Sequence, residues 1–96
     1  MYAQLFTFKL GPNMRQTAEQ IADQSFPGYK SMKGFKSAIY LGDEASGEYG
    51  ALSIWESKED IDAAIAILRP KTEEALAGIV KEPPVTKVYE VYEPKT

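Results

Sequence analysis

Apolar and polar residues alternate with a period of two in four parts of the chain, and this alternation predicts strands. The strands are expected at residues 2–10, 35–41, 48–56 and 85–92. A polar segment at 42–47 separates the second and third strands, so these two are expected to form a hairpin with a longer turn.

Helical spacing of apolar residues predicts a first helix over about 14–25. Asn13 is the expected N-cap, with Gln16 three residues later as its capping-box partner. The sequence Phe-Pro-Gly at 26–28 is the expected stop, because the residue before a proline disfavours helical geometry. Residues 29–34 then form a loop.

A second helix is expected after Ser57, a residue type that accepts hydrogen bonds from a helix N-terminus. Acidic residues such as Asp60 fill its first turn, which suits the helix dipole. Pro70 is expected to end this helix. A short third helix follows at about 72–77, with Gly78 as its stop.

The resulting order is β-α-β-β-α-β with a small additional helix. This is the split βαβ order of a ferredoxin-like α+β fold, in which two helices cover one face of an antiparallel sheet. The 96 residues contain no repeat and no linker-like stretch, so we expect a single domain over 1–96.

Both faces of the predicted strands carry apolar side chains. Phe6 and Phe8 alternate with Leu5 in the first strand, and Tyr49 lies on the face opposite Leu52 in the third. Two helices cover only one face, and monomers seldom leave a large apolar patch bare. The pattern predicts a homodimer with two sheets face to face; the alternative is a monomer with an amphipathic open face.

Composition removes several chemistries. The chain has no cysteine and no histidine, which excludes disulfides, thiol nucleophiles, Cys/His zinc sites, a histidine base and a Ser-His-Asp triad. A net charge of −3 disfavours nucleic-acid binding. The acids Glu59, Asp60 and Asp62 lie at a helix start, so we expect capping there and no metal site.

The sequence has no apolar run of the ~20 residues that a membrane span needs. The N-terminal residues lack the basic start and apolar stretch of a signal peptide. We therefore expect a cytoplasmic protein with no membrane partner.

Candidate ligand-binding residues follow from the face that carries Trp55. Regular pleating places Phe8 and several other side chains of the first and third strands on that face. An apolar cleft with a few polar groups is typical of a site for a small aromatic molecule. The candidates are Gln4, Phe6, Tyr49, Ser53, Trp55 and Arg69. The alternative is core packing for the aromatic residues and a helix-dipole role for Arg69.

Two segments resemble a known family. Residues 34–40 read GFKSAIY and residues 52–59 read LSIWESKE. They resemble the Gly-Phe strand and the Trp-Glu-Ser step of the antibiotic biosynthesis monooxygenase family. The resemblance implies a dimeric α+β barrel that oxygenates a phenol, anthrone or quinol without a cofactor. In that chemistry the substrate loses a proton and its carbanion passes an electron to O₂.

Most catalytic positions of that family are not matched. Members that oxidise polyketide phenols have Asn, Tyr and Arg where this chain has Ala51, Ile61 and Ala75. Haem-degrading members use a histidine, which this chain lacks. The catalytic residues are therefore unknown from the sequence. The alternative function is a non-catalytic dimer that binds a small ligand or serves as an interaction module.

Overall fold

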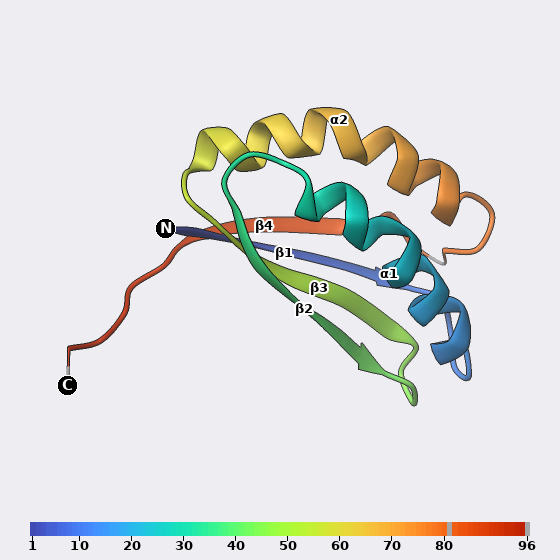
Figure 1. Cartoon of the computed structure of the whole chain (residues 1–96). Helices are drawn as coiled ribbons and strands as arrows, with labels where there is room; N and C mark the ends of the chain where they lie inside the picture. The colour runs from blue at the N-terminus through green and yellow to red at the C-terminus, as the bar shows by residue number, and fades with distance from the viewer. Residues whose placement is uncertain (81, 96) are drawn as a thin grey trace.

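The computed structural model of the chain describes residues 1–80 and 82–95 (Figure 1). The elements are β1 (Tyr2–Lys9), α1 (Arg15–Lys30), β2 (Phe35–Asp43), β3 (Glu48–Trp55), α2 (Lys58–Leu76) and β4 (Val85–Glu90). The predicted α+β class and its β-α-β-β-α-β order are confirmed.

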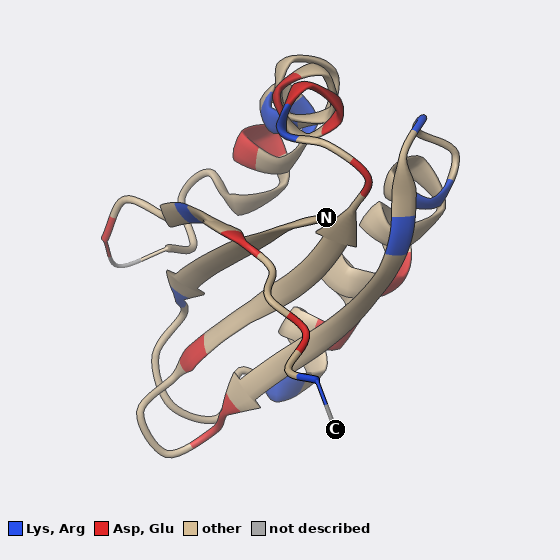
Figure 2. Cartoon of the chain, turned by 90° about the vertical axis from the view of Figure 1, so that its left-hand side faces the viewer, with Lys and Arg blue, Asp and Glu red and all other residues tan. Residues whose placement is uncertain are grey.

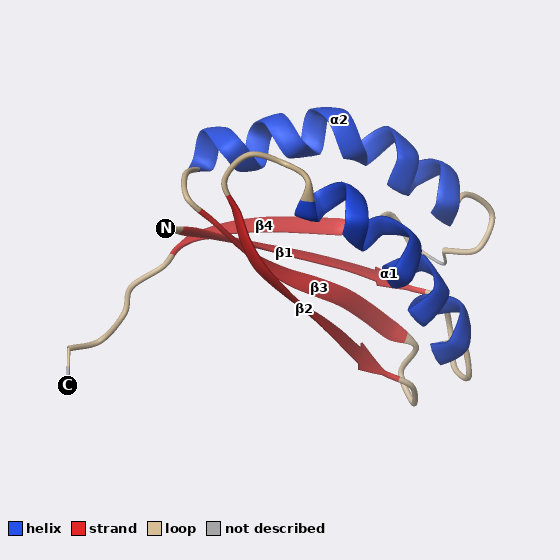
Figure 3. Cartoon of the chain, in the orientation of Figure 1, coloured by secondary structure: helices blue, strands red, loops and turns tan. Residues whose placement is uncertain are grey.

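The four strands form one antiparallel sheet in the order β2-β3-β1-β4. Both helices lie on the same face of this sheet (Figure 3). Gln4 pairs with Ser53 and Phe6 with Ala51 across β1 and β3, so these side chains share the helix-covered face. The face predicted from the alternation is confirmed.

No element among residues 1–80 and 82–95 covers the other face of the sheet (Figures 1 and 2). It carries Ile39, which is 61% exposed, together with the exposed side chains of Leu41, Val85 and Tyr89. The central strands β1 and β3 bear charges only at Lys9 and Glu48, at one end of the sheet (Figure 2). Lys87 of β4 also lies on this face, opposite Leu5 in the register, and is exposed. The open face is therefore mainly apolar, with one charge on its β4 edge.

The first helix differs from its prediction at both ends. It continues to Lys30, so the expected stop at Phe-Pro-Gly is wrong. The Phe26 ring packs edge-on against Phe35 with centroids 6.0 Å apart, and a Cβ on Gly28 would lie 3.2 Å from Leu68. Packing on both sides thus keeps the last turn helical, and exposed Pro27 only removes one backbone donor.

The expected cap of this helix is also wrong. Asn13 has a φ of +64°, the left-handed conformation of a tight turn. The helix begins one residue after Met14, and no side chain caps it. The turn that carries the chain from β1 to α1 therefore uses Asn13 for its backbone conformation.

The second helix is continuous through Pro70, so its expected end there and the separate third helix are both wrong. Leu68 and Leu76 lie on either side of the proline and are both buried, which holds both halves against the sheet. Thr72 also donates its hydroxyl to the Leu68 carbonyl at 3.2 Å. The Ser57 cap is confirmed, because its Oγ accepts from the backbone N–H of Asp60.

Strand ends differ from the prediction by a few residues. β2 extends to Asp43, and β4 ends at Glu90 rather than at residue 92. The N–H of Val91 still donates to the Met1 carbonyl at 3.0 Å, beside the start of β1. Neither helix in the described ranges has the length and apolar character that crossing a membrane requires.

The core has two clusters on the helix-covered face. One surrounds Trp55 and includes Ile61 and Leu68. The other surrounds Phe8 and includes Tyr49. These clusters pack opposite ends of the helix layer onto the sheet.

Candidate functional site

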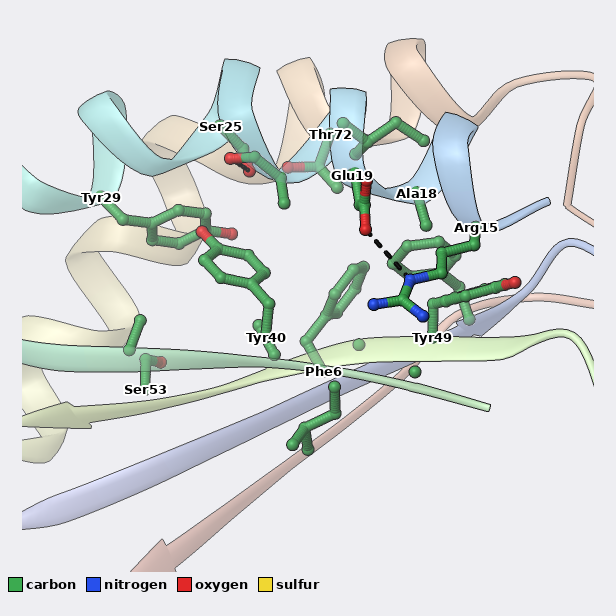
Figure 4. Close-up of a pocket in the computed structure, with 18 of the residues that line it drawn as sticks. Phe6, Arg15, Ala18, Glu19, Ser25, Tyr29, Tyr40, Tyr49, Ser53 and Thr72 are labelled. Carbon is green, nitrogen blue, oxygen red and sulfur yellow. Dashed lines mark hydrogen bonds and ion pairs between the residues drawn. The ribbon is translucent and has the colours of Figure 1, made fainter. Parts of the chain in front are cut away.

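A cavity of about 290 Å³ lies between α1 and the sheet (Figure 4). Its helical side is formed by one face of α1, at Ala18, Ile21, Ala22, Ser25 and Tyr29. Its sheet side is formed by Gln4, Phe6, Phe8, Tyr49, Ala51 and Ser53 from β1 and β3, with Ala38 and Tyr40 from β2. The volume is near the lower end for small-molecule sites, which favours a small ligand.

The sheet side contains two buried polar side chains. Gln4 is 3% exposed and Ser53 is 7% exposed, and the two are directly opposed on β1 and β3. The Ser53 Oγ accepts a hydrogen bond of 2.8 Å from the indole Nε1 of Trp55. Both Gln4 and Ser53 line the cavity among mostly apolar neighbours.

Trp55 itself is not brought to the cavity. Its side chain is fully buried and packs edge-on against Phe35, with centroids 5.3 Å apart, and against Tyr29 at 6.4 Å. Ile61 and Leu68 of α2 complete its surroundings. Trp55 is thus packed in the core, and it contacts the cavity wall through its hydrogen bond to Ser53 and its packing on Tyr29.

Arg69 is likewise absent from the cavity wall. Its guanidinium lies 5.4 Å from the centre of the Phe6 ring, and its Nη2 donates to Thr86 Oγ1 at 2.7 Å. A guanidinium over an aromatic face is a favourable cation–π contact. Arg69 thus contacts Phe6 from outside the cavity, whereas Phe6 and Tyr49 are part of the cavity wall.

The sequence reasoning missed the contribution of α1 and β2. Tyr40 projects into the cavity region near Tyr29 and Ser25 (Figure 4). Burial raises the pKa of Tyr40, as do Tyr29 and Asp23 to a smaller extent, against the lowering effect of a hydrogen bond with Ser25. The Tyr40 phenol is therefore neutral near pH 7 and can donate a hydrogen bond.

The sequence pattern indicates which residues of α1 face the cavity. Ala18, Ala22, Ser25 and Tyr29 recur at helical spacing of three and four, which places them on one face of α1. The small side chains of Ala18, Ala22 and Ser25 leave the space that forms the cavity.

Charged residues are confined to the rim of the cavity. Arg15 and Glu19 are both exposed and form an ion pair of 3.0 Å, and Glu44 lies nearby on the β2–β3 turn (Figure 4). The interior carries hydroxyl, phenol and amide groups instead. Such a site can bind and orient a ligand by hydrogen bonds while its apolar walls exclude water.

The positions at which the family resemblance suggested catalytic residues are dispersed. Ala51 lines the cavity, Ile61 is fully buried beside Trp55, and Ala75 is exposed on α2. Within the described residues, no group of three acidic side chains is placed to hold a metal ion.

No protein-family model matches this sequence, and no curated protein matches it. Solved structures do match over nearly the whole chain. A Nitrosomonas europaea protein named for antibiotic biosynthesis monooxygenases is 10% identical, with a TM-score of 0.81 over 99% of this chain and 93% of its own. SnoaB, a cofactor-independent oxygenase from Streptomyces nogalater, is 12% identical, with a TM-score of 0.75 over 97% and 93%.

A monooxygenase of Streptomyces coelicolor, from the gene ActVA-Orf6, was solved in complex with the ligand nanaomycin D. It is 20% identical, with a TM-score of 0.74 over 99% of this chain and 90% of its own. At these identities the likeness establishes a shared fold. The resemblance to antibiotic biosynthesis monooxygenases is thus confirmed at the level of architecture.

Proposed function

We propose that the protein is a cofactor-independent monooxygenase that oxidises a small electron-rich aromatic compound of the phenol, anthrone or quinol type. The observation that carries this proposal is the cavity under α1, which combines apolar walls with the buried polar pair Gln4 and Ser53. The fold shared with SnoaB and the Streptomyces coelicolor monooxygenase supports it.

The proposed reaction needs only substrate and oxygen. An activated ring CH₂, as in anthrone or in the keto tautomer of a phenol or quinol, becomes a carbonyl. One atom of O₂ enters the product and the other leaves as water, so two electrons and the two protons of the CH₂ reduce that second atom. The substrate must first lose a proton and become an electron-rich anion. Hydrogen bonds aimed at the developing oxyanion in a dry cavity would favour that loss.

We also propose that the active form is a homodimer held by the open face of the sheet. The exposed side chains of Ile39, Leu41, Val85 and Tyr89 support this proposal, because they form an apolar surface on the face away from the helices. Each copy would then keep its own cavity on the outer side of its sheet.

Oxygen uptake with anthrone and hydroquinones tests the activity, with ¹⁸O₂ labelling of the product. We expect uptake above the uncatalysed rate and one labelled oxygen per product. The Ala22→Phe variant should lose activity by at least tenfold, because Ala22 lines the cavity. Ala63→Phe is the matched control, since Ala63 is exposed on α2. Uptake that never exceeds background contradicts the proposal.

A non-catalytic ligand-binding protein is the second candidate. It is favoured by the alanine and isoleucine at positions 51 and 61, where the resemblance suggested Asn and Tyr. Saturable binding of the same aromatic compounds, blocked by Ala22→Phe and without consumption of oxygen, would establish this function instead.

A further inference from the structure

We propose that Gln4 and Ser53 together bind a ring-borne oxygen of the ligand, and that Trp55 is a positioning residue that fixes the Ser53 hydroxyl. This assignment deepens the proposed function and rests on it only in placing the ligand in the same cavity. The ligand class is a flat, largely apolar ring system with a carbonyl or phenolate oxygen.

The register of the sheet brings the two polar groups together. Gln4 and Ser53 are Cα partners across β1 and β3, and opposed side chains in an antiparallel pair lie about 5 Å apart. Both lie on the helix-covered face, and both line the cavity. One ligand atom can therefore be reached by both side chains.

The hydrogen bonds of Gln4 and Ser53 leave donor groups of both side chains without a protein partner in the described part of the chain. The Ser53 Oγ accepts the indole N–H of Trp55 at 2.8 Å, which leaves its hydroxyl proton to be donated elsewhere. Among residues 1–80 and 82–95, the side-chain hydrogen bonds give that proton no acceptor and give the Gln4 amide no partner. In the same ranges the buried side-chain atom without a partner is the Tyr49 hydroxyl, which belongs to the same cavity wall, and the Gln4 amide atoms are not fully buried. A ligand oxygen in the cavity is therefore an acceptor that the Gln4 amide and the Ser53 hydroxyl can both reach.

Trp55 is suited to hold this arrangement. Its side chain is completely buried, and the rings of Phe35 and Tyr29 pack edge-on against it. The direction of its N–H is therefore fixed by packing on β2 and α1. Because this N–H donates to the Ser53 Oγ from a fixed direction, it restricts the rotation of the Ser53 hydroxyl. The O–H of Ser53 then points away from Trp55, toward the cavity.

One part of the remaining wall is apolar. Phe6 and Ala51 are neighbours in register on the same face, and Ile21 lies across from them on α1. These side chains offer no hydrogen bonds to a ligand. A molecule that carries an oxygen at the Gln4–Ser53 end and hydrocarbon against Phe6, Ala51 and Ile21 satisfies both regions.

Paired ligands test the assignment directly. Anthrone and 9,10-dihydroanthracene have similar ring frameworks, and only anthrone carries the carbonyl oxygen. We expect the protein to bind anthrone at least about tenfold more tightly in anaerobic titrations, which prevent turnover. Equal affinity of the two compounds for the native protein would overturn the proposal.

Variants then separate positioning from packing. Ser53→Ala and Gln4→Met should each reduce the preference for anthrone by about fivefold or more, with little change for dihydroanthracene. Trp55→Phe keeps a ring but removes the N–H, so it should also reduce the preference. Ser31→Ala is the control, because the Ser31 hydroxyl is exposed and bonds to the Gly28 carbonyl. An equal loss of affinity for both ligands in Trp55→Phe would make Trp55 a packing residue only.

A measurement on the native protein covers the case in which Trp55→Phe does not fold. A Ser53 hydroxyl that donates to the ligand becomes a better acceptor for the indole N–H. The ¹⁵N–¹H resonance of Trp55 should therefore move on binding anthrone and not on binding dihydroanthracene. Identical spectra with both ligands would refute the link. Selective anthrone binding without oxygen uptake would refute the oxygenase and leave this assignment standing.

Discussion

Gly34 lies where the loop after α1 enters β2, and its backbone has a φ of +84°. A Cβ at this position would overlap the carboxylate of Asp60, the residue whose N–H is capped by Ser57. Glycine at this position thus allows the left-handed backbone conformation, and its lack of a Cβ lets the N-terminus of α2 approach closely.

Gly34→Ala should lower the free energy of unfolding by about 2–4 kcal/mol, because strain in the left-handed region adds to disturbance of the α2 cap. Chemical denaturation measures this change. Gly78→Ala is the matched control, since Gly78 has a similar φ of +81° and open space around its Cα. It should cost only about 1–2 kcal/mol. Equal losses in the two variants would show that contact with Asp60 has no role.

Ionisation of Tyr40 makes the free energy of unfolding depend on pH in the alkaline range. Burial raises its pKa in the folded chain, so folding favours the neutral phenol. The contribution is complete below the unfolded value near 10 and is lost as pH rises through the folded pKa. Tyr40→Phe should therefore show a weaker fall in stability above about pH 10. Tyr92→Phe, which removes a phenol from a side chain that is 76% exposed, is the matched control variant.

Strand alternation in the sequence predicts that Gln4 and Ser53 lie on the cavity side of the sheet, but it does not predict the position of Trp55 relative to the cavity. Strict alternation places Gln4 and Ser53 on one face, so their meeting in the cavity follows from strand geometry. Trp55 obeys the same alternation but lies two residues further along, beneath α2 rather than beside the cavity. Strand alternation determines which side chains point toward the helices. It does not determine which of them a helix covers and which line a cavity, because that depends on where the helices lie.

The two proline-containing helices show how tertiary packing outweighs a local signal. Pro27 and Pro70 both lie inside helices that the sequence suggested they would end. Each residue is exposed, while buried or half-buried neighbours hold the backbone on both sides. Residues such as Leu76 lie too far along the chain for their contact with β1 and β3 side chains to be evident from sequence spacing.

Pro70→Ala should raise the free energy of unfolding by about 2 kcal/mol. The variant restores a helical N–H and removes the interior proline penalty, with a smaller opposing gain in unfolded-chain entropy. Urea denaturation measures the effect. Pro12→Ala, in the exposed turn before α1, should be neutral or slightly destabilising. A less stable Pro70→Ala protein would mean that α2 needs the proline bend to seat Leu76.

The molecule as a whole has one covered and one open sheet face. Ile39→Asp, on the open face, should convert a dimer of twice the 10.7 kDa chain mass into a monomer at micromolar concentration, as measured by light scattering. A buried aspartate at an apolar interface lacks a partner and is strongly unfavourable. Ile67→Asp is the control, since Ile67 is 56% exposed on α2. A native protein that is already monomeric would contradict the proposed homodimer.

The overall topology could be predicted because the hydrophobic pattern of the sequence indicates both the order of the elements and the alternation of side chains along each strand. The cavity could not, because it results from small residues on α1, such as Ala18 and Ala22, opposite the sheet. Alanine fits equally well beneath a close-packed helix and above an empty space. Only the three-dimensional distance between α1 and β1 distinguishes these cases.

The hydrogen bond from the Val91 N–H to the Met1 carbonyl brings the start of β1 and the end of β4 to the same corner of the sheet. The connectivity of the fold is therefore almost a closed loop. A circular permutant that joins these ends through a short linker, and opens the chain within the exposed residues 44–46 of the β2–β3 turn, would keep every strand pairing and both helices. Such a rearranged chain would free the β2–β3 corner, beside the cavity rim, to carry a fused reporter.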